Sequence, residues 1–391
     1  MHLDNSQIAA VRAAISSPRK LHIITGPAGT GKTTVVQHIA DGLLRRVTLL
    51  APTGKAASRI RDKCGMPAVT VHRELLYDGE RYRRSNPLDR VTIVDEASML
   101  DSSLLATIIS YQPPRLILVG DADQLPPVGT GQPFFDLVNS PRVEVSRLTT
   151  VHRSRAAVLQ AATAIRAGQM PPAHLRTDCE SGIETWRMVE TGPAEPTTAK
   201  LIEWIRAGYY DPQQDVILSP RYGTEDNDAG IDAINKAVRA VVNPPTVGLS
   251  LCVGDRMLCC KNFGGDDLWN GDTGTVVDLT SADLPVVRLD RDPHNLREIS
   301  QEQLRECRLG YAMSVHKSQG SEFRRVFFIC LAVHQHMLSR SLIYTAITRA
   351  RSGCVVMGQM RAFGIGLRMT SRKRTVLQQL LRGENIAEVR R

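Results

Sequence analysis

Short apolar runs alternate with amphipathic stretches along the first third of the chain. The runs are rich in Val, Ile and Leu, and the stretches between them carry apolar residues at helical spacing. Strands that are buried on both faces show no polar alternation, so this pattern is typical of a parallel sheet with helices on both sides. The pattern therefore predicts an α/β fold. We expect strands at residues 21–25, 46–52, 90–97 and 115–121, and helices at 33–46 and 54–63.

The same alternation continues after residue 148, with one interruption. We expect helices at 154–167, 197–207 and 228–242, and strands at 216–220, 324–333 and 354–358. Between them, residues 246–305 hold short apolar segments separated by Asn-Gly, Gly-Asp and Pro, which favour tight turns between antiparallel strands. The sequence therefore predicts one α/β domain over residues 1–147, a second over 148–245 and 306–391, and a small antiparallel β-barrel inserted at 246–305.

Composition and charge narrow the class of protein. Hydrophobic residues make up 42% of the chain and charged residues 23%, as is ordinary for a globular protein. No apolar run reaches the roughly 18 residues of a membrane span, and the first residues lack the layout of a signal peptide, so we expect a cytoplasmic protein. The eight cysteines lack the spacing of zinc sites or disulfide frameworks and are interpreted as free thiols. The net charge of +9 favours a polyanionic partner, although many basic proteins bind no nucleic acid.

A glycine-rich segment between the first predicted strand and the first predicted helix carries the clearest chemical signature. Its sequence, GPAGTGKTT, fits G-x-x-x-x-G-K-[ST]. In this motif backbone N–H groups surround phosphates, the lysine reaches the β- and γ-phosphate oxygens, and the hydroxyl binds Mg²⁺. We therefore expect ATP here, with Thr33 as a ligand of Mg²⁺. The expected contacts are Gly26, Pro27, Ala28, Gly29, Thr30, Gly31, Lys32, Thr33 and Thr34.

Two further strand ends carry polar residues suited to phosphoryl transfer. Asp95 and Glu96 end one predicted strand, where Asp95 is expected to hold Mg²⁺ and Glu96 to deprotonate the attacking water. Two acids at a helix N-cap are the structural alternative. Gln124, in GDADQLPPVG, follows the next strand. Because open α/β sheets bind ligands at the carboxyl ends of their strands, we expect Gln124 near the γ-phosphate, in a loop whose motion two prolines limit.

The order of the motifs resembles that of the superfamily 1 DNA helicases, specifically their RecD-like branch. The matching stretches are LDNSQIAAV, GPAGTGKTT, APTGKAASRI, VDEASM, GDADQLPPVG, LTTVHRS, GYAMSVHKSQGSEF and YTAITRAR. The resemblance covers nearly the whole chain. It implies two RecA-like domains, a hairpin inserted at about residues 74–89 of the first, and an SH3-like fold for the inserted barrel. We expect the motor core alone, without the long N-terminal domain of some RecD-like proteins.

The resemblance also assigns roles outside the glycine-rich loop. It implies that Gln7 reads the adenine edge, and that Gly320 and Glu322 lie by the γ-phosphate and the ribose. It makes Arg153 and Arg349 arginine fingers from the second domain, which neutralise charge that develops in phosphoryl transfer. The catalytic candidates are therefore Lys32, Glu96, Gln124, Arg153 and Arg349.

Two positions depart from the pattern of the family. His152 stands where an aromatic residue often stacks on the base, which puts base selectivity in doubt. Ser314 stands where Thr is usual, and the hydroxyl is kept.

Single-stranded DNA is expected across the tops of both α/β domains. The expected contacts offer hydroxyls, imidazoles and positive charge to phosphates and stacked bases, without reading the base sequence. They are Pro52, Thr53, Lys55, Thr70, His72, Arg73, Ser314, His316 and Lys317. For each of them a purely local structural role is the alternative.

The segment LLYDGERYRRS, at residues 75–85, predicts a short hairpin with Asp78-Gly79 at its turn. In the RecD-like pattern this location carries a pin beside the point where the strands separate. Tyr77 or Tyr82 is expected to stack on the last base pair, while neighbouring arginines hold phosphates. A solvent-exposed loop is the alternative, because a two-stranded hairpin is marginally stable alone.

The leading hypothesis for the function is an ATP-driven and Mg²⁺-dependent translocase on single-stranded DNA that unwinds duplexes at ss/ds junctions. The 5′ to 3′ direction comes from the resemblance. One alternative is a DNA-binding ATPase subunit that only switches conformation within a larger recombination or repair complex. Another is an RNA remodeller of the same superfamily. We expect a monomer with possible replication or repair partners.

Overall fold

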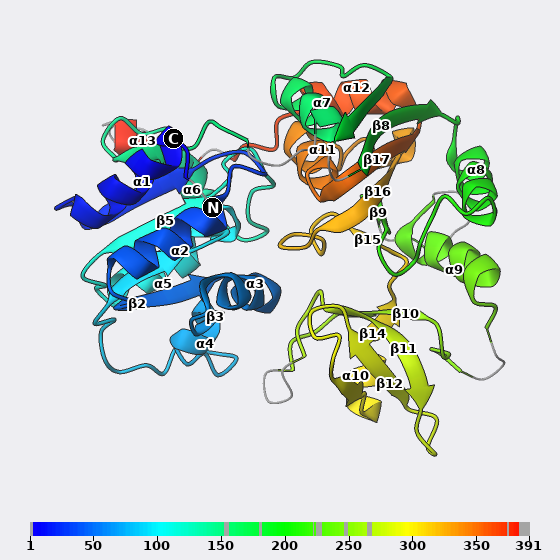
Figure 1. Ribbon diagram of the computed structural model, residues 1–391, viewed down its shortest axis with the longest axis horizontal. Helices are drawn as coiled ribbons and strands as arrows, with labels where there is room; N and C mark the ends of the chain where they lie inside the picture. Colours follow the sequence, from blue (N-terminus) through cyan, green and yellow to red (C-terminus); the bar gives the residue numbers. More distant parts are fainter. Residues whose placement is uncertain are drawn as a thin grey trace, which may run out of the picture. The chain divides into compact units, whose positions relative to one another are not determined.

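The computed structural model describes residues 3–151, 156–179, 182–221, 223, 229–245, 249–263, 268–373 and 375–382. The chain forms two compact units (Figure 1). Unit 1 comprises Met1–Arg153 and Ser371–Arg391, and unit 2 comprises Ser154–Thr370.

This division corrects one expected domain boundary. The segment from Ser371 onward belongs to unit 1, whereas the sequence pattern placed it in the second domain. The physical reason is a set of contacts between residues far apart in the chain. Lys373 exchanges two hydrogen bonds with the side chain of Gln132, and the hydroxyl of Thr375 donates to Asp136.

Unit 1 is built on a six-stranded sheet in the order β3-β2-β4-β5-β1-β6, and every neighbouring pair is parallel. The strands are β1 Leu21–Thr25, β2 Val47–Ala51, β3 Ala68–Thr70, β4 Val91–Val94, β5 Leu116–Gly120 and β6 Val145–Arg147. The four predicted strands are confirmed. The helices are α1 Asn5–Ser16, α2 Lys32–Gly42, α3 Gly54–Cys64, α4 Val71–Glu74, η1 Ala97–Met99, α5 Ser102–Ser110, α6 Pro133–Val138 and α13 Val376–Arg382.

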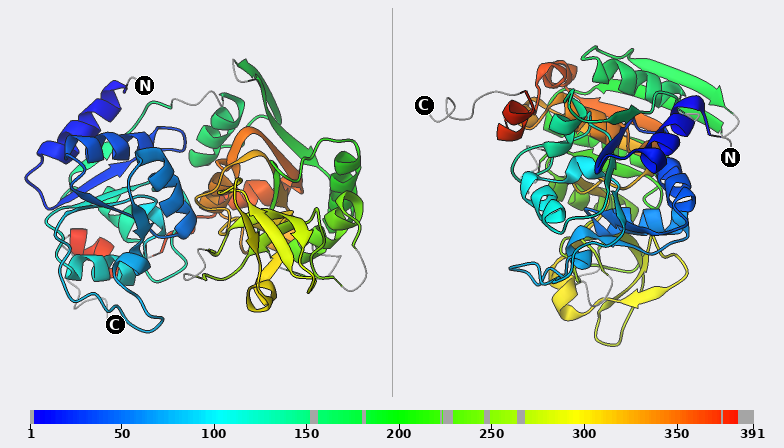
Figure 2. Two further views of the ribbon diagram at one scale, coloured as in Figure 1. Left: turned by 60° about the horizontal axis from the view of Figure 1, so that its bottom comes forward. Right: turned by 90° about the vertical axis from the view of Figure 1, so that its left-hand side faces the viewer.

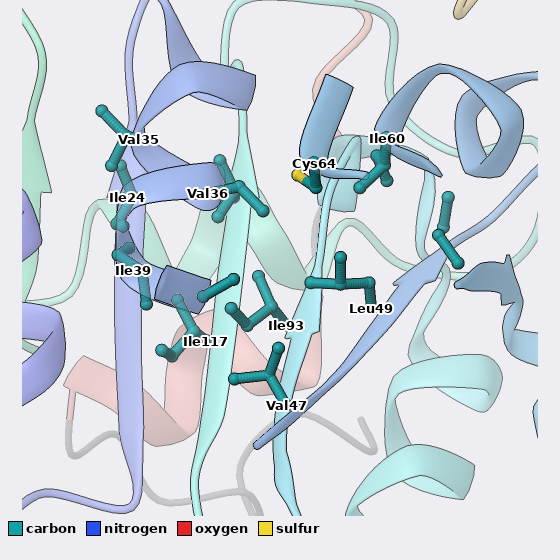
Figure 3. Packing of buried hydrophobic residues seen from close by; sticks show 14 of the residues in the cluster. Ile24, Val35, Val36, Ile39, Val47, Leu49, Ile60, Cys64, Ile93 and Ile117 are labelled. Atoms are coloured by element: carbon teal, nitrogen blue, oxygen red, sulfur yellow. The ribbon is translucent and has the colours of Figure 1, made fainter. Parts of the chain in front are cut away.

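Alternate residues of the strands enter two separate hydrophobic cores, one on each face of the sheet. Ile24 and Ile117 belong to the core that includes residues of α1, α2 and α3. Figure 3 shows them with labelled side chains of α2 and α3. Their neighbours Ile23 and Leu118 pack with α4, α5 and α6. Burial on both faces explains why these strands read as continuous apolar runs.

Unit 2 has its own six-stranded sheet, in the order β15-β9-β16-β17-β8-β7. Its strands are β7 His174–Cys179, β8 Gly182–Glu190, β9 Val216–Ser219, β15 Ala312–Ser314, β16 Phe323–Cys330 and β17 Ala350–Gly358. All pairs are parallel except β7 with β8. The helices are α7 Ala156–Arg166, α8 Ala194–Arg206, α9 Ile231–Val242, η4 Ala332–His334, α11 Arg340–Ile347 and α12 Met360–Arg368. The antiparallel β7–β8 pair was not predicted.

Between α9 and β15, unit 2 carries a small antiparallel β-sheet, drawn in yellow in Figure 2. Its order is β13-β12-β11-β10-β14, and it encloses a core of its own. The strands are β10 Arg256–Cys259, β11 Thr273–Leu279, β12 Pro285–Leu289, β13 Leu296–Glu298 and β14 Cys307–Leu309, with α10 Gln301–Arg305 before the last. Because β14 pairs with β10, the insertion extends beyond the expected end at residue 305.

Within the described part of the chain, no helix combines the length and the apolar character that crossing a membrane requires.

Candidate nucleotide and nucleic-acid site

The strand order of unit 1 brings three of the predicted motifs to one edge of the sheet. β5 lies between β4 and β1, with Thr25 opposite Gly120 and Val94 opposite Leu118. The segments that follow these strands therefore leave the same carboxyl edge. They are the glycine-rich loop, the Asp95–Glu96 pair and the loop of Gln124.

The glycine-rich loop is shaped to hold an anion. Gly29 and Gly31 have φ angles of 87° and 73°, a left-handed conformation that favours glycine. No side chain caps the start of α2 at Gly31, so its first N–H groups face the loop. The Nζ of Lys32 donates to the carbonyls of Gly26 and Pro27, at 2.8 and 3.1 Å. The ammonium is thus held at the loop where phosphates are expected.

Gln7 contacts the same loop from α1. Asp4 and Gln7 form a capping box at the start of this helix, and the Gln7 Nε2 donates to the carbonyl of Thr30 at 3.0 Å. A Cβ at Gly31 would lie 2.5 Å from that nitrogen, so the approach requires glycine. The predicted adenine reader therefore lies directly against the phosphate loop.

The acid pair lies next to the hydroxyl at the start of α2. The Thr33 Oγ1 donates to the Asp95 Oδ2 at 3.3 Å, and both acids are buried. Burial raises the pKa of Asp95, and the neighbouring carboxylate of Glu96 raises it further. A hydroxyl and a carboxylate are both oxygen donors, the kind that Mg²⁺ prefers in combination with phosphates. The residues present fit the expected Mg²⁺.

Glu96 also has a cationic neighbour that sequence reasoning missed. The Nη1 of Arg59, on α3, lies 3.8 Å from the Glu96 Oε1. Glu96 itself has a φ of 53°, which is uncommon for a residue other than glycine and occurs often at functional sites.

Gln124 is buried in a tightly held loop. Its N–H donates to the Asp121 carbonyl at 3.3 Å, and the Asp121 carboxylate accepts the N–H of Asp123. Further along, the Thr130 carbonyl accepts the N–H of Ser102, the first residue of α5. The strand that leads to this loop, β5, lies between β1, which leads to the glycine-rich loop, and β4, which leads to the acid pair.

In unit 2, the predicted finger Arg349 follows α11 and is buried. Its Nε donates to the Thr345 carbonyl at 3.2 Å and its Nη1 to the Ser321 carbonyl at 3.4 Å. It therefore lies beside Gly320 and Glu322, in the segment QGSEF. His152 and Arg153 lie outside the described residues.

Two polar groups in QGSEF are buried without a hydrogen-bond partner among the described residues. They are the Gln319 Nε2 and the Ser321 Oγ. An unpaired buried donor is costly, and one next to an arginine finger candidate points to a missing oxygen ligand. The sequence motif assigned roles only to Gly320 and Glu322 of this segment, so Gln319 and Ser321 were missed.

The hydroxyls expected on the DNA track also have local structural roles. Thr53 and Thr70 accept backbone N–H groups at the starts of α3 and α4, and Ser314 accepts the N–H of Lys317. Lys55 lies in the first turn of α3, after Pro52. Both roles are compatible, because a capping hydroxyl keeps its own proton for a phosphate oxygen.

Burial favours the neutral form of the two histidines of the track. Burial lowers the pKa of His72, on α4 next to Arg73, below its ordinary value. Burial alone lowers the pKa of His316 in the same direction. They can offer ring faces and neutral nitrogens to DNA.

The segment predicted as a pin contains an antiparallel bridge between Tyr77 and Tyr82. Gly79 has a φ of 108°, as the expected turn requires. The Asp78 carboxylate accepts the N–H groups of Glu80 and Arg81, which together with a bond from Arg83 lowers the pKa of Asp78 to about 2.

The two tyrosines of this segment have different surroundings. Tyr77 is 41% exposed, whereas Tyr82 is half-buried and packs against the core beneath α4 and α5. Their ring centroids are 4.9 Å apart, and His72 lies 5.3 Å from the Tyr77 ring. Tyr77 of this segment therefore packs against His72, which belongs to the predicted DNA contact TVHR at residues 70–73.

Comparison with known proteins adds sequence relatives and a structural neighbour. The model of the AAA domain matches residues 2–184, and that of the UvrD-like helicase C-terminal domain matches residues 309–357. The ATP-dependent RecD2 DNA helicase of Deinococcus radiodurans is 34% identical over 93% of this chain. The RecBCD enzyme subunit RecD of Mycolicibacterium smegmatis is 30% identical over 96% of this chain.

The chain spans 50% of the length of the Deinococcus protein and 74% of that of the Mycolicibacterium protein. A crystal structure of the Pif1 helicase from Bacteroides, in complex with ADP-AlF3 and ssDNA, has a TM-score of 0.53. It is 19% identical and the match covers 91% of this chain and 92% of that chain, which shows a shared fold.

Proposed function

This chain belongs to the RecD-like branch of the superfamily 1 helicases, and from that premise we propose that it is an ATP-dependent DNA helicase. The observation that carries the proposal is the meeting of the glycine-rich loop, the Asp95–Glu96 pair and Gln124 at one sheet edge. The relatives named above are a DNA helicase and a RecBCD subunit, and the Pif1 structure contains ssDNA.

The proposed chemistry begins with a change of partner at Lys32. Its ammonium leaves the carbonyls of Gly26 and Pro27 and binds the β- and γ-phosphate oxygens of ATP. The Glu96 carboxylate accepts a proton from the attacking water, and Gln124 orients that water. Thr33 and Asp95 would hold Mg²⁺, which when bound neutralises charge on the phosphate oxygens.

The proposed role of unit 2 is to supply a positive charge and hydrogen-bond donors to the γ-phosphate. Arg349 offers a guanidinium, and Gln319 and Ser321 offer two buried donors that lack partners in the described residues. Arg153, outside the described residues, is proposed as a second finger. Donors placed at developing charge accelerate phosphoryl transfer, so hydrolysis depends on residues of both units.

The proposed DNA track runs over the loops that begin α3 and α4 and the loop after β15. Lys55, Arg73 and Lys317 neutralise phosphates, while neutral His72 and His316 contact bases or sugars. The inserted sheet is proposed to be an SH3-like barrel, and the segment around Tyr77 to be the pin that stops the duplex. Translocation from 5′ to 3′ is part of the proposal.

A second candidate function is that of an ATPase subunit within a larger complex. The observation that favours it is the match to the RecBCD enzyme subunit RecD, of which the chain spans 74%. In that case ATP hydrolysis still responds to DNA, but the isolated chain does not separate strands.

The proposed function is tested by steady-state ATPase measurements with and without a single-stranded DNA oligonucleotide, and with an RNA of the same sequence. We expect DNA to raise kcat at least about tenfold, and Lys32→Ala to abolish the activity, because the lysine contacts the phosphates. Lys236→Ala, on α9 away from the predicted motifs, is the control and should retain full activity. Indifference to DNA would contradict the proposal, and stronger stimulation by RNA would favour the RNA remodeller.

A further inference from the structure

The chain enters unit 1 a second time through a short segment that ends on the loop of Gln124. Thr370 is the last residue of unit 2 and Ser371 is the first of the returning segment. We call residues 369–373 the C-terminal strap. The strap is followed by α13, which packs against α6.

Lys373 binds the Gln124 loop through its side chain. Its Nζ donates to the carbonyl of Pro127 at 2.8 Å and to that of Gly129. Its backbone also exchanges two hydrogen bonds with the buried side chain of Gln132, at 3.1 and 2.9 Å. One residue of the strap therefore binds three positions within eight residues of Gln124.

The opposite side of the same loop packs closely against the start of α5. A Cβ at Gly129 would lie 2.0 Å from the Asp101 Oδ2, and one at Gly131 would lie 2.0 Å from the Ser102 Oγ. Asp101 caps α5, the helix that follows the acid pair and η1. The loop therefore has the start of α5 on one side and is bound by Lys373 through the carbonyls of Pro127 and Gly129.

The other end of the strap is fixed within unit 2. Arg340, the first residue of α11, donates from its Nε to the Leu367 carbonyl at 2.9 Å and from its N–H to the Met369 carbonyl at 3.0 Å. α11 ends at Ile347, two residues before the finger candidate Arg349. A single helix therefore carries the root of the strap at one end and Arg349 at the other.

The short length of the strap limits how far its two ends can move apart. Lys373 is four residues after Met369, and an extended chain spans at most about 3.6 Å per residue step, or about 14 Å in all. A movement of α11 and α12 relative to unit 1 is therefore transmitted to Lys373 as soon as the strap is extended.

We propose that the C-terminal strap is a mechanical link that makes the position of the Gln124 loop depend on the α11–α12 end of unit 2. Lys373 is its positioning residue. The inference rests on the proposed function and adds to it a second covalent route between α11, which precedes Arg349, and the loop of Gln124. A simple anchor for α13 would need only the bond from Thr375 to Asp136 and the packing of Leu381, not the carbonyls of the Gln124 loop.

The first test removes the contact. Lys373→Met keeps the aliphatic stem and loses the three donors, and Lys373→Arg restores donors to the same carbonyls. We expect Lys373→Met to lower the stimulation of ATPase kcat by single-stranded DNA about 5- to 10-fold, a usual size for coupling between sites. DNA-free ATPase and the KM for ATP should stay within about twofold. Lys373→Arg should recover at least half of the stimulation. Thr375→Val, which removes the contact to Asp136 and the hydrogen bond from the Gln378 N–H but leaves the bonds of Lys373, should keep it.

The second test keeps every contact and slackens the link. Five Gly/Ser residues inserted between Thr370 and Ser371 leave both ends of the strap intact but lengthen its reach by about 17 Å. We expect the same loss of stimulation as in Lys373→Met, with an unchanged Tm. Full stimulation in this variant would overturn the link, as would equal losses of basal and DNA-stimulated activity in Lys373→Met.

Hydrogen exchange tests the link independently of ATPase activity, and so independently of the proposed function. If the intact chain shows no DNA-stimulated ATPase, the proposed function fails, and the amides of residues 121–131 still report on the link. We expect their exchange to rise at least about threefold in Lys373→Met and in the slackened chain, because the loop loses a restraint in both. Unchanged exchange in both variants would overturn the link.

Discussion

Positive charge on the proposed DNA track comes from lysine and arginine, although histidine occupies two of its positions. A buried imidazole loses hydration when it is charged, so burial lowers the pKa of His72 and of His316 below the ordinary value of 6.5. Both side chains are therefore neutral at pH 7.5, and each gains a charge only when the pH falls below its lowered pKa. A lysine side chain ordinarily has a pKa of about 10.4, far above this range.

This difference predicts how single substitutions alter the salt dependence of DNA binding. At pH 7.5, Lys55→Ala and Lys317→Ala should each flatten the log–log slope of affinity against salt by nearly one, because each removes one phosphate contact. His72→Gln and His316→Gln should leave the slope unchanged while they weaken binding. Fluorescence anisotropy with a dT oligonucleotide at several salt concentrations measures both quantities. A slope that flattens equally in the histidine variants would mean that the imidazoles are charged and paired with phosphates.

Motif spacing predicted the residues of the phosphate loop and the acid pair, and the structure places them at one sheet edge as that prediction requires. Arg59, Gln319 and Ser321 were not found, since their relevance comes from contacts and burial that spacing does not encode. Arg59 lies on α3, far along the chain from Glu96, and only the fold makes them neighbours.

At the scale of single elements, the segment around Tyr77 combines an exposed ring with an anchored base. Arg84 bonds to Glu74 at 2.7 Å and to the carbonyls of Asn86 and Pro87, so it holds the segment to the body of unit 1. Tyr82 adds a packing contact with the core. The exposed Tyr77 is then the side chain available to stack on a base pair.

The two tyrosines are therefore expected to differ when each is replaced by alanine. Tyr77→Ala should slow the unwinding of a forked duplex severalfold, since stacking on a base contributes roughly 1–3 kcal/mol, and it should leave ATPase activity unchanged. Tyr82→Ala should lower the Tm of the protein, because it removes a partly buried ring from the core. Strand-displacement, ATPase and thermal-unfolding measurements on both variants decide the matter. A pin role for Tyr77 is contradicted if its loss slows ATP hydrolysis as much as unwinding.

Strands buried on both faces were predictable because their apolar runs are continuous. The three-residue strands β3 and β6 were missed, because so short a run has no recognisable period. β8 was missed for another reason: its sequence GIETWRMVE mixes charged and apolar residues and gives no unbroken run. The residues of α13 were expected in the second domain, and the place of this segment in unit 1 depends on Gln132 and Asp136.

At the scale of the whole molecule, the chain crosses between its two units twice, at residues 153–154 and 370–371. The proposed hydrolysis draws on Glu96 and Gln124 from unit 1 and on Arg349 from unit 2. We propose that this ATP hydrolysis moves one unit relative to the other. We therefore propose that this chain couples ATP hydrolysis to strand separation.

Strand displacement on forked DNA tests this claim most directly. The substrates are forks whose only single-stranded loading tail is 5′ or 3′, and the chains compared are the intact protein and Glu96→Gln. We expect ATP-dependent displacement from the 5′-tailed fork, loss of it when Mg²⁺ is chelated, and loss of it in Glu96→Gln together with an ATPase rate lower by at least about 100-fold. DNA-stimulated ATPase in the intact protein without displacement of any fork would contradict the account, and would identify the chain as a DNA-responsive ATPase that does not unwind.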